Sequence, residues 1–354
     1  MFPYISLLLL FVLFACLSLL KLSKDSNLLL WRISFIVLFL FSGLRYDVGM
    51  DYLSYEEMYK YSYPSPNPEI KELGWAYLFY WGRILNIHFY FVILLVSFLT
   101  IKNVFIFISR YSPYPFLSIL IFFCFTQYYT YTFNVLRQCL ASYLFFTLLV
   151  LIKERKMVRY LISVSLISVF IHSTAIMMFP LYFILHKHFS IIIKILIIFA
   201  VLLFAKSFVF IIESSEKYSI YLKFEEFSEG ITITTILLII ITSLYQIYDL
   251  FVKERDVMHN IFINIAYCSL VALITACFFE NTPLIIVFQR FAYYFTPVLI
   301  VLLPITIKDV LKNPLRKIVF LFVVIIYSSL FCYTTSKGGI NNKLIPYKTI
   351  MSNF

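Results

Sequence analysis

A series of apolar runs, each about twenty residues long and separated by short basic or proline-containing breaks, sets narrow limits on the fold. A run of that length suits a helix that crosses a bilayer, where only helices and closed barrels satisfy their backbone polar groups. Barrel strands would give short alternating segments instead. The sequence therefore predicts an all-α, polytopic transmembrane helical bundle with about 10–12 membrane helices, including a short helical hairpin.

Charged residues and prolines mark where each span ends. The composition agrees, because 62% hydrophobic and 13% charged residues differ strongly from the balance of a soluble domain. No soluble domain or internal repeat is recognisable, so residues 1–354 are expected to form a single integral membrane domain. The expected spans are residues 3–21, 29–44, 88–109, 114–131, 134–152, 189–212, 231–251, 258–279, 286–307 and 315–334.

Residues 160–185 form an apolar stretch that is too long for one ordinary span and short for two. It either crosses once or goes out and returns as a hairpin. The hairpin keeps the later basic clusters in the cytoplasm with the earlier ones, as the positive-inside rule requires. On that topology two segments are external: residues 45–87, with an interfacial helix at about residues 69–85, and residues 213–230.

The formal net charge of +11 does not indicate a nucleic-acid partner, because the basic residues lie in short clusters between apolar runs. The six cysteines show no CxxC spacing, and no His/Asp/Glu cluster has convincing ligand spacing. Neither a P-loop nor a GxGxxG motif is present, so a nucleotide donor has no support. We expect no cofactor and no metal.

Three arginines, Arg45, Arg137 and Arg290, fall at the predicted outer ends of apolar helices. Intramembrane arginines are costly unless they snorkel, pair with an acid or meet an anionic ligand. A guanidinium donates two parallel hydrogen bonds and keeps its charge, which suits a lipid pyrophosphate. Snorkelling or structural pairing of any one of the three is the alternative.

His172 lies at the predicted turn of the hairpin, where its ring could take a proton from a sugar hydroxyl or could be satisfied by neighbouring helices. Asp47 and Asp51 lie four residues apart after Arg45, and either could bind a hydroxyl or pair with that arginine. Glu72 lies near the start of the interfacial helix, where it could also act on the helix N-terminus electrostatically. Tyrosines of this segment suit an aromatic belt or stacking on sugar rings.

These residues carry a family resemblance. The sequence resembles the Wzy-type polysaccharide polymerases, in particular the EpsG-like branch. The matching pieces are Gly43-Leu44-Arg45-Tyr46-Asp47-Val48-Gly49-Met50-Asp51-Tyr52 with Tyr55, Glu72-Leu73-Gly74-Trp75, Asn134-Val135-Leu136-Arg137-Gln138 with Ala141, His172-Ser173-Thr174-Ala175, and Arg290 with Tyr293.

The resemblance implies a membrane glycosyltransferase that joins undecaprenyl-pyrophosphate-linked oligosaccharide repeat units for O-antigen, capsule or exopolysaccharide. It also implies a multi-pass protein of the bacterial inner membrane whose active site faces outward. The implied catalytic residues, which would activate the acceptor hydroxyl, are His172, Asp47 and Asp51. The implied substrate-binding residues are Arg45, Arg137, Arg290, Glu72, Tyr52, Gln138 and Tyr293.

The expected partners are the lipid-linked oligosaccharides, a chain-length regulator and a flippase. A flippase or other transporter of lipid-linked oligosaccharides is the alternative function; it predicts charged residues along a midplane pathway and repeated halves. A membrane acyltransferase is a third function that would use a histidine, with acyl-CoA-facing groups on the cytoplasmic side.

Overall fold

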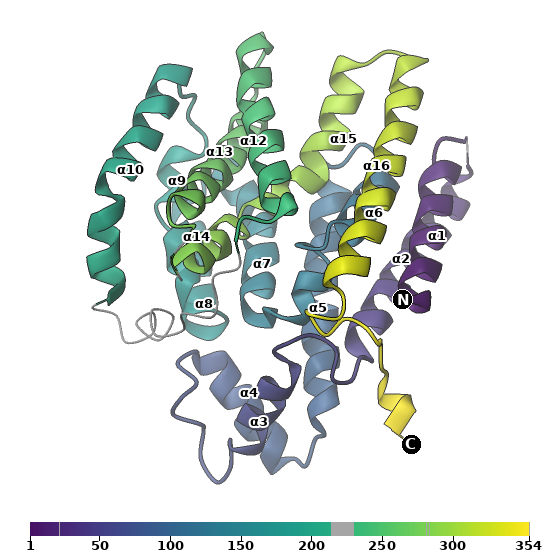
Figure 1. The fold of residues 1–354 in the computed structure, drawn as a ribbon, viewed down its shortest axis with the longest axis vertical. Coiled ribbons are helices and arrows are strands. Elements are labelled where there is room, and N and C mark those ends of the chain that lie inside the picture. The colour runs from purple at the N-terminus through teal and green to yellow at the C-terminus, as the bar shows by residue number, and fades with distance from the viewer. Residues whose placement is uncertain (21, 214–229, 281, 283, 354) are drawn as a thin grey trace. The chain divides into compact units, whose positions relative to one another are not determined.

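The computed structural model describes residues 1–354 except 21, 214–229, 281, 283 and 354. Helices form the described part of the chain, which contains no β-strand, so the predicted all-α class is confirmed (Figure 1). Seven helical segments are long and apolar enough to cross a membrane, and shorter apolar helices accompany them. The chain is therefore a multi-pass membrane protein.

The seven long segments agree with expected spans to within a few residues at most ends. They are α2 (Lys24–Gly43), α5 (Phe89–Tyr111), α7 (Leu136–Lys153), α12 (Ile233–Phe251), α13 (Val257–Phe278), the interrupted segment Leu284–Val310 and α16 (Leu315–Gly338). The other helices are α1 (Phe2–Leu17), α3 (Tyr52–Lys60), α4 (Leu73–Ile84), α6 (Pro115–Cys124), α8 (Met157–Phe170), α9 (Leu181–Ile184) and α10 (Ile191–Glu213), with short 3₁₀ turns at η1 (Thr130–Phe133), η2 (Ser173–Met178) and η5 (Ile350–Asn353).

The chain divides into two compact units. The first comprises Met1–Leu148, Val158–Phe179 and Ile300–Phe354, and the second comprises Leu149–Met157 and Pro180–Leu299. In the first unit α6 is the central helix: Pro115 apart, all of its residues are buried, as expected for a helix that is apolar on every face. Helices α1, α5 and α16 contact α6, and α2 packs on α5.

The expected span at 114–131 is wrong in its second half, because α6 ends at Cys124. The residues that follow are rich in hydroxyl groups, which bond nearby carbonyls instead of leaving them to a helix. Thr130 donates to the carbonyl of Thr126 at 2.7 Å, and Thr132 donates to that of Tyr129 at 2.6 Å. The chain therefore turns through η1 before α7 begins.

The expected span at 286–307 is also interrupted. It forms α14 (Leu284–Ala292), the 3₁₀ turn η4 (Thr296–Val298) and α15 (Leu299–Val310). Pro297 has no backbone N–H to donate and disfavours helical geometry in the residue before it, which explains a break at this point.

Residues 160–185 turn back, as the hairpin alternative predicts. Helix α8 ends at Phe170, and η2 and α9 follow after a turn. The Tyr160 hydroxyl, from the first turn of α8, donates to the carbonyl of Met178 at 2.7 Å. Tyr160 lies near the start of α8, and Met178 lies at the end of η2, after the turn. A hydrogen bond between them requires the segment that follows the turn to run antiparallel to α8.

The predicted interfacial helix begins later than expected, at Leu73 rather than at about residue 69. Helices α3 and α4 contact one another, and α4 contacts α5 (Figure 1). The other predicted external loop, 213–230, falls almost entirely on residues that lie outside the described ranges.

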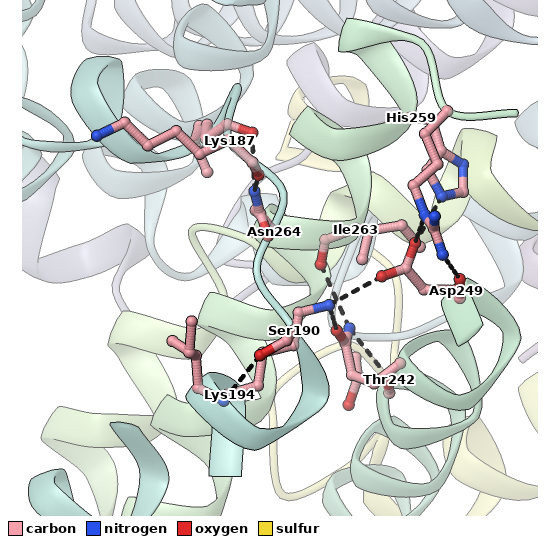
Figure 2. A network of polar contacts seen from close by, with 12 residues as sticks. Lys187, Ser190, Lys194, Thr242, Asp249, His259, Ile263 and Asn264 are labelled. Carbon is pink, nitrogen blue, oxygen red and sulfur yellow. Dashed lines mark hydrogen bonds and ion pairs between the residues drawn. The ribbon is translucent and has the colours of Figure 1, made fainter. Parts of the chain in front are cut away.

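In the second unit α13 contacts α10, α12 and α14, and one buried charge network joins three of these helices. Lys194 of α10, 3% exposed, donates from Nζ to Asp249 Oδ2 of α12 at 3.1 Å and to Gln246 Oε1 at 2.9 Å. Asp249 Oδ1 lies 2.9 Å from Nε2 of His259 on α13 and 3.2 Å from Nε of Arg255. Figure 2 shows the side chains of Lys194 and His259 pointing toward Asp249. One carboxylate therefore fixes the ends of α10, α12 and α13.

Candidate active site

The chain leaves α2 through a tight turn that requires a glycine. Gly49 has a positive φ of 97°, and a Cβ there would lie 2.6 Å from the carbonyl oxygen of Phe133. The backbone N–H of Met50 donates to Asn134 Oδ1 at 2.7 Å. The turn is thus attached to the segment that leads into α7, and α3 begins directly after it.

A close backbone approach docks α4 on the end of α8. A Cβ on Gly74 would lie only 2.2 Å from the carbonyl oxygen of Phe170, the last residue of α8. The Trp75 indole Nε1 donates to the carbonyl of Ile171 at 2.9 Å, satisfying an acceptor at the helix end. Glu72 precedes Gly74 and Trp75 in the sequence, so these two contacts hold it against the residues that follow α8.

The Glu72 carboxylate is the centre of the site. Its side chain is 3% exposed, and Oε2 accepts from Arg137 Nη1 at 2.7 Å. Its other oxygen, Oε1, lies 3.2 Å from His172 Nδ1 and accepts from the backbone N–H and the hydroxyl of Ser173, both at 3.3 Å. Residues from α4, α7 and the turn after α8 therefore share one carboxylate.

This arrangement determines the chemistry of the histidine ring. A carboxylate only accepts hydrogen bonds, so His172 Nδ1 carries the proton that faces Glu72. In the neutral ring the lone pair then resides on Nε2, which is the form of imidazole that accepts a proton. The His172 side chain is 15% exposed, so it is close to the protein surface rather than deep in the core.

Arg137 is held in place by an aromatic residue as well as by the carboxylate. Its Nε donates to the Tyr55 hydroxyl at 3.3 Å, and its Cζ lies 5.4 Å from the centre of the Tyr55 ring. Tyr55 in turn packs against Trp75, with ring centroids 6.0 Å apart. Burial raises the pKa of Tyr55 against the opposing effect of Arg137, so the phenol stays neutral. The Arg137 side chain remains 22% exposed and can contact an anion.

The structure brings three of the predicted site residues, Glu72, Arg137 and His172, into direct contact. Asp51 stands at the N-cap of α3, and its charge acts on Tyr55. Gln138 follows Arg137 and is 3% exposed.

The structure places the remaining predicted site residues as follows. Tyr52 is 1% exposed and packs edge-on against Phe89, 5.5 Å between centroids. Arg290 belongs to α14 and Tyr293 follows its end, both in the second unit. Asp47 does not form the ion pair with Arg45 that was the structural alternative. Its Oδ2 lies 3.6 Å from Nζ of Lys348 instead.

Sequence reasoning assigned Glu72 to substrate binding, with an electrostatic effect on the helix N-terminus as the alternative, and missed that one carboxylate contacts both Arg137 and His172. Glu72 does occupy the N-cap of α4, but its carboxylate makes no capping bond there. Arg137 and His172 are 65 and 100 residues away from it in sequence. The available signals were the presence of a few charged residues in a strongly apolar chain and the short motifs around them, and neither indicates that the three side chains meet. In the described ranges, no group of three or more His, Cys, Asp or Glu side chains could hold a metal ion.

One comparison with known proteins gave a match. The model of the EpsG family matches residues 28–349, nearly the whole chain, including all of the site residues described above. No curated protein and no solved structure matches.

Proposed function

Because the chain belongs to the EpsG family, whose membership indicates a membrane protein related to polysaccharide synthesis, we propose that it is a polymerase that joins lipid-linked oligosaccharide repeat units. The proposed donor is a growing glycan on undecaprenyl pyrophosphate, and the proposed acceptor is a second lipid-linked unit. The product would be O-antigen, capsule or exopolysaccharide.

The single observation that carries this proposal is the Glu72 carboxylate shared by a histidine and an arginine. Glycosyl transfer from a lipid pyrophosphate needs a base for the acceptor hydroxyl and a cation for the leaving group. His172 and Arg137 have these properties, and one buried carboxylate sets the position of both. Glu72 is a positioning residue in this scheme.

The proposed transfer breaks one bond for each bond that it forms. The acceptor hydroxyl gives its proton to Nε2 of His172 while its oxygen bonds to the anomeric carbon of the donor. The bond between that carbon and the pyrophosphate oxygen breaks, and the electron pair stays on the pyrophosphate. The guanidinium of Arg137 stabilises the charge that develops there.

We further propose that this site faces the outside of the bacterial inner membrane. The proposal rests on the positive-inside rule: the hairpin after Tyr160 keeps the basic clusters in the cytoplasm. The turn that carries His172 then lies at the opposite boundary. A flippase would deliver the substrates to that side, and a chain-length regulator would act with the polymerase.

The test is substitution of His172 or Arg137 by alanine in producing cells, with the surface glycan separated by size on gels. Loss of long chains with single-repeat material still displayed supports polymerisation. Loss of every surface repeat unit would identify a transporter of lipid-linked oligosaccharides instead. Arg83→Ala, at the exposed far end of α4, is the matched control and should leave the glycan pattern unchanged.

A further inference from the structure

Arg45 is a fully buried arginine whose charge is only partly satisfied. Its side chain is among the largest with no exposed surface. One nitrogen, Nη1, donates to the carbonyl of Ser42 and lies 3.3 Å from the Ser42 hydroxyl and 3.4 Å from that of Ser97. The guanidinium carbon also lies 4.8 Å from the centre of the Phe133 ring. All of these partners are uncharged.

The other two guanidinium nitrogens of Arg45, Nε and Nη2, are buried and have no acceptor in the part of the chain that the structure describes. No carboxylate of that part forms an ion pair with them either. Nε and Nη2 form the side edge of the guanidinium, which offers two parallel N–H groups to one phosphate or carboxylate. A buried cation with this edge unused is unfavourable unless an anion joins it.

The segment formed by residues 339–350, which we name the C-terminal strap, pairs with the backbone at Arg45. It leaves the end of α16 and pairs with the turn after α2, where Arg45 and Thr349 form an antiparallel bridge (Figure 1). On either side of the bridge, the N–H of Ile350 donates to the carbonyl of Leu44 and the N–H of Tyr46 donates to that of Lys348, both at 3.0 Å. The strap therefore lies directly on the backbone of the arginine.

The strap is also fixed by aromatic packing, by one surface ion pair and by two further hydrogen bonds: the Tyr4 hydroxyl donates to the carbonyl of Leu344, and the N–H of Gly49 donates to that of Lys343, both at 3.0 Å. Tyr347 stacks on Phe41 with centroids 4.0 Å apart, and its hydroxyl donates to the carbonyl of Phe41 at 2.6 Å. Lys348 and Asp47, whose side chains are 47% and 26% exposed, lie 3.6 Å apart. An ion pair this exposed stabilises little, and a short surface segment opens at lower cost than a spanning helix.

We propose that Arg45 is a buried subsite for a phosphoryl oxyanion and that the C-terminal strap is the lid that admits it. The anion would bond to the Nε and Nη2 edge. Lys348 lies on the lid itself, so its charge, once released from Asp47, is available to the incoming anion. The inference rests on the proposed function only for the source of the anion, a lipid-linked pyrophosphate; the lid and the anion site are tested without any polymerisation.

The test uses Ser42→Cys, which places a thiol beside the guanidinium in the last turn of α2, where the native side chain is 2% exposed. The exposed native thiol is removed by Cys332→Ser, and that variant alone gives the background from the other cysteines. Purified full-length protein in lipid nanodiscs is treated with a small anionic methanethiosulfonate, and the labelling rate is measured. Lys348→Glu turns the ion pair of the lid into repulsion and should speed labelling several-fold. Lys337→Glu, exposed on α16 outside the strap, should not.

Inorganic pyrophosphate is then added as the probe, and lipid-linked pyrophosphate in a second arm. We expect pyrophosphate to slow labelling, and we expect Arg45→Gln to abolish that protection. Protection by the lipid-linked form alone identifies the lipid as the source. Equal labelling in Lys348→Glu and Lys337→Glu overturns the lid, and protection that survives Arg45→Gln overturns the anion site.

Hydrogen exchange on the unsubstituted protein provides a second measurement that does not depend on a folded cysteine variant. The amides of Tyr46 and Ile350 should exchange faster when pyrophosphate is bound with the lid open. Unchanged or slower exchange overturns the lid. A failure of either test leaves the effect of His172→Ala on surface glycan intact, so the two proposals fail separately.

Discussion

Replacing Glu72 by glutamine tests the site most directly, because it keeps the shape of the side chain and removes only its charge and one acceptor. Each oxygen of the carboxylate contacts a different residue: Oε2 accepts from Arg137, and Oε1 faces His172 Nδ1. A glutamine has one oxygen and one NH₂ group. If the NH₂ faces Arg137, two donors oppose each other. If it faces His172, Nδ1 must accept, and the ring proton moves to Nε2.

The expected magnitudes differ for stability and for rate. At 2.7 Å the Glu72–Arg137 pair has a gross attraction of about 6 kcal/mol at an effective dielectric constant of about 20, much of which offsets desolvation. Because Arg137 is 22% exposed, we expect the loss in stability to be about 3 kcal/mol, at the low end for breaking a buried pair. Loss of the correct tautomer should slow transfer about 10²- to 10⁴-fold, since that is the contribution of a positioned base.

The assay is the initial rate of chain elongation by purified protein in nanodiscs, with lipid-linked repeat units as substrate and thermal unfolding measured in parallel. Glu69→Gln, an exposed acid of the same segment, is the matched control and should change neither quantity. Glu72→Asp should recover part of the rate, because it restores the charge. An elongation rate for Glu72→Gln equal to that of the unsubstituted protein would refute the assignment of His172 as a base held by this carboxylate.

Three further substitutions have defined outcomes. Arg137→Lys keeps the charge but loses the donor that bonds the Tyr55 hydroxyl. The elongation rate in the same assay should fall about tenfold, which is a smaller loss than with Arg137→Ala. Gly74→Ala places a Cβ against the last carbonyl of α8. It should lower the stability by about 1–3 kcal/mol and should also lower the elongation rate. Gly230→Ala, at a position with open space around it, is the control in thermal unfolding. Asp249→Asn leaves the buried lysine of α10 without its counter-charge and should destabilise the protein by about 3–5 kcal/mol, whereas exposed Asp309→Asn should leave the unfolding midpoint in place.

The fold was predictable to the extent that it depends on local composition. Apolar runs gave the helical class and most helix positions, because a helix in lipid satisfies its backbone within its own segment. The failures occurred where single polar residues decide the conformation. The hydroxyls of Thr130 and Thr132 bond nearby carbonyls after α6 ends. A hydropathy average over about twenty residues does not detect the effect of two such side chains.

The site was predictable only in its parts. Arg137, Glu72 and His172 stood out because charged and titratable groups are expensive in an apolar chain and persist for a reason. Their contact depends on how α4 meets α8, through the missing Cβ of Gly74 and the indole of Trp75. Those are packing relations between distant segments, and spacing along the chain contains no information about them.

Arg45 and Arg137, the two predicted site arginines that lie in the first unit, are in opposite electrostatic situations. Arg137 has its charge matched by Glu72 and keeps part of its surface in reach of a ligand. Arg45 has no counter-charge in the described structure and no exposed surface. A matched and accessible cation binds an anion without a change of fold, whereas an unmatched and covered one gains more from an anion but only after a segment moves. Binding at Arg45 is therefore coupled to the C-terminal strap, and binding at Arg137 is coupled to the protonation of His172 through Glu72. Arg137→Lys should therefore lower the rate of transfer in the elongation assay, and Arg45→Lys should chiefly weaken the protection by pyrophosphate in the labelling assay.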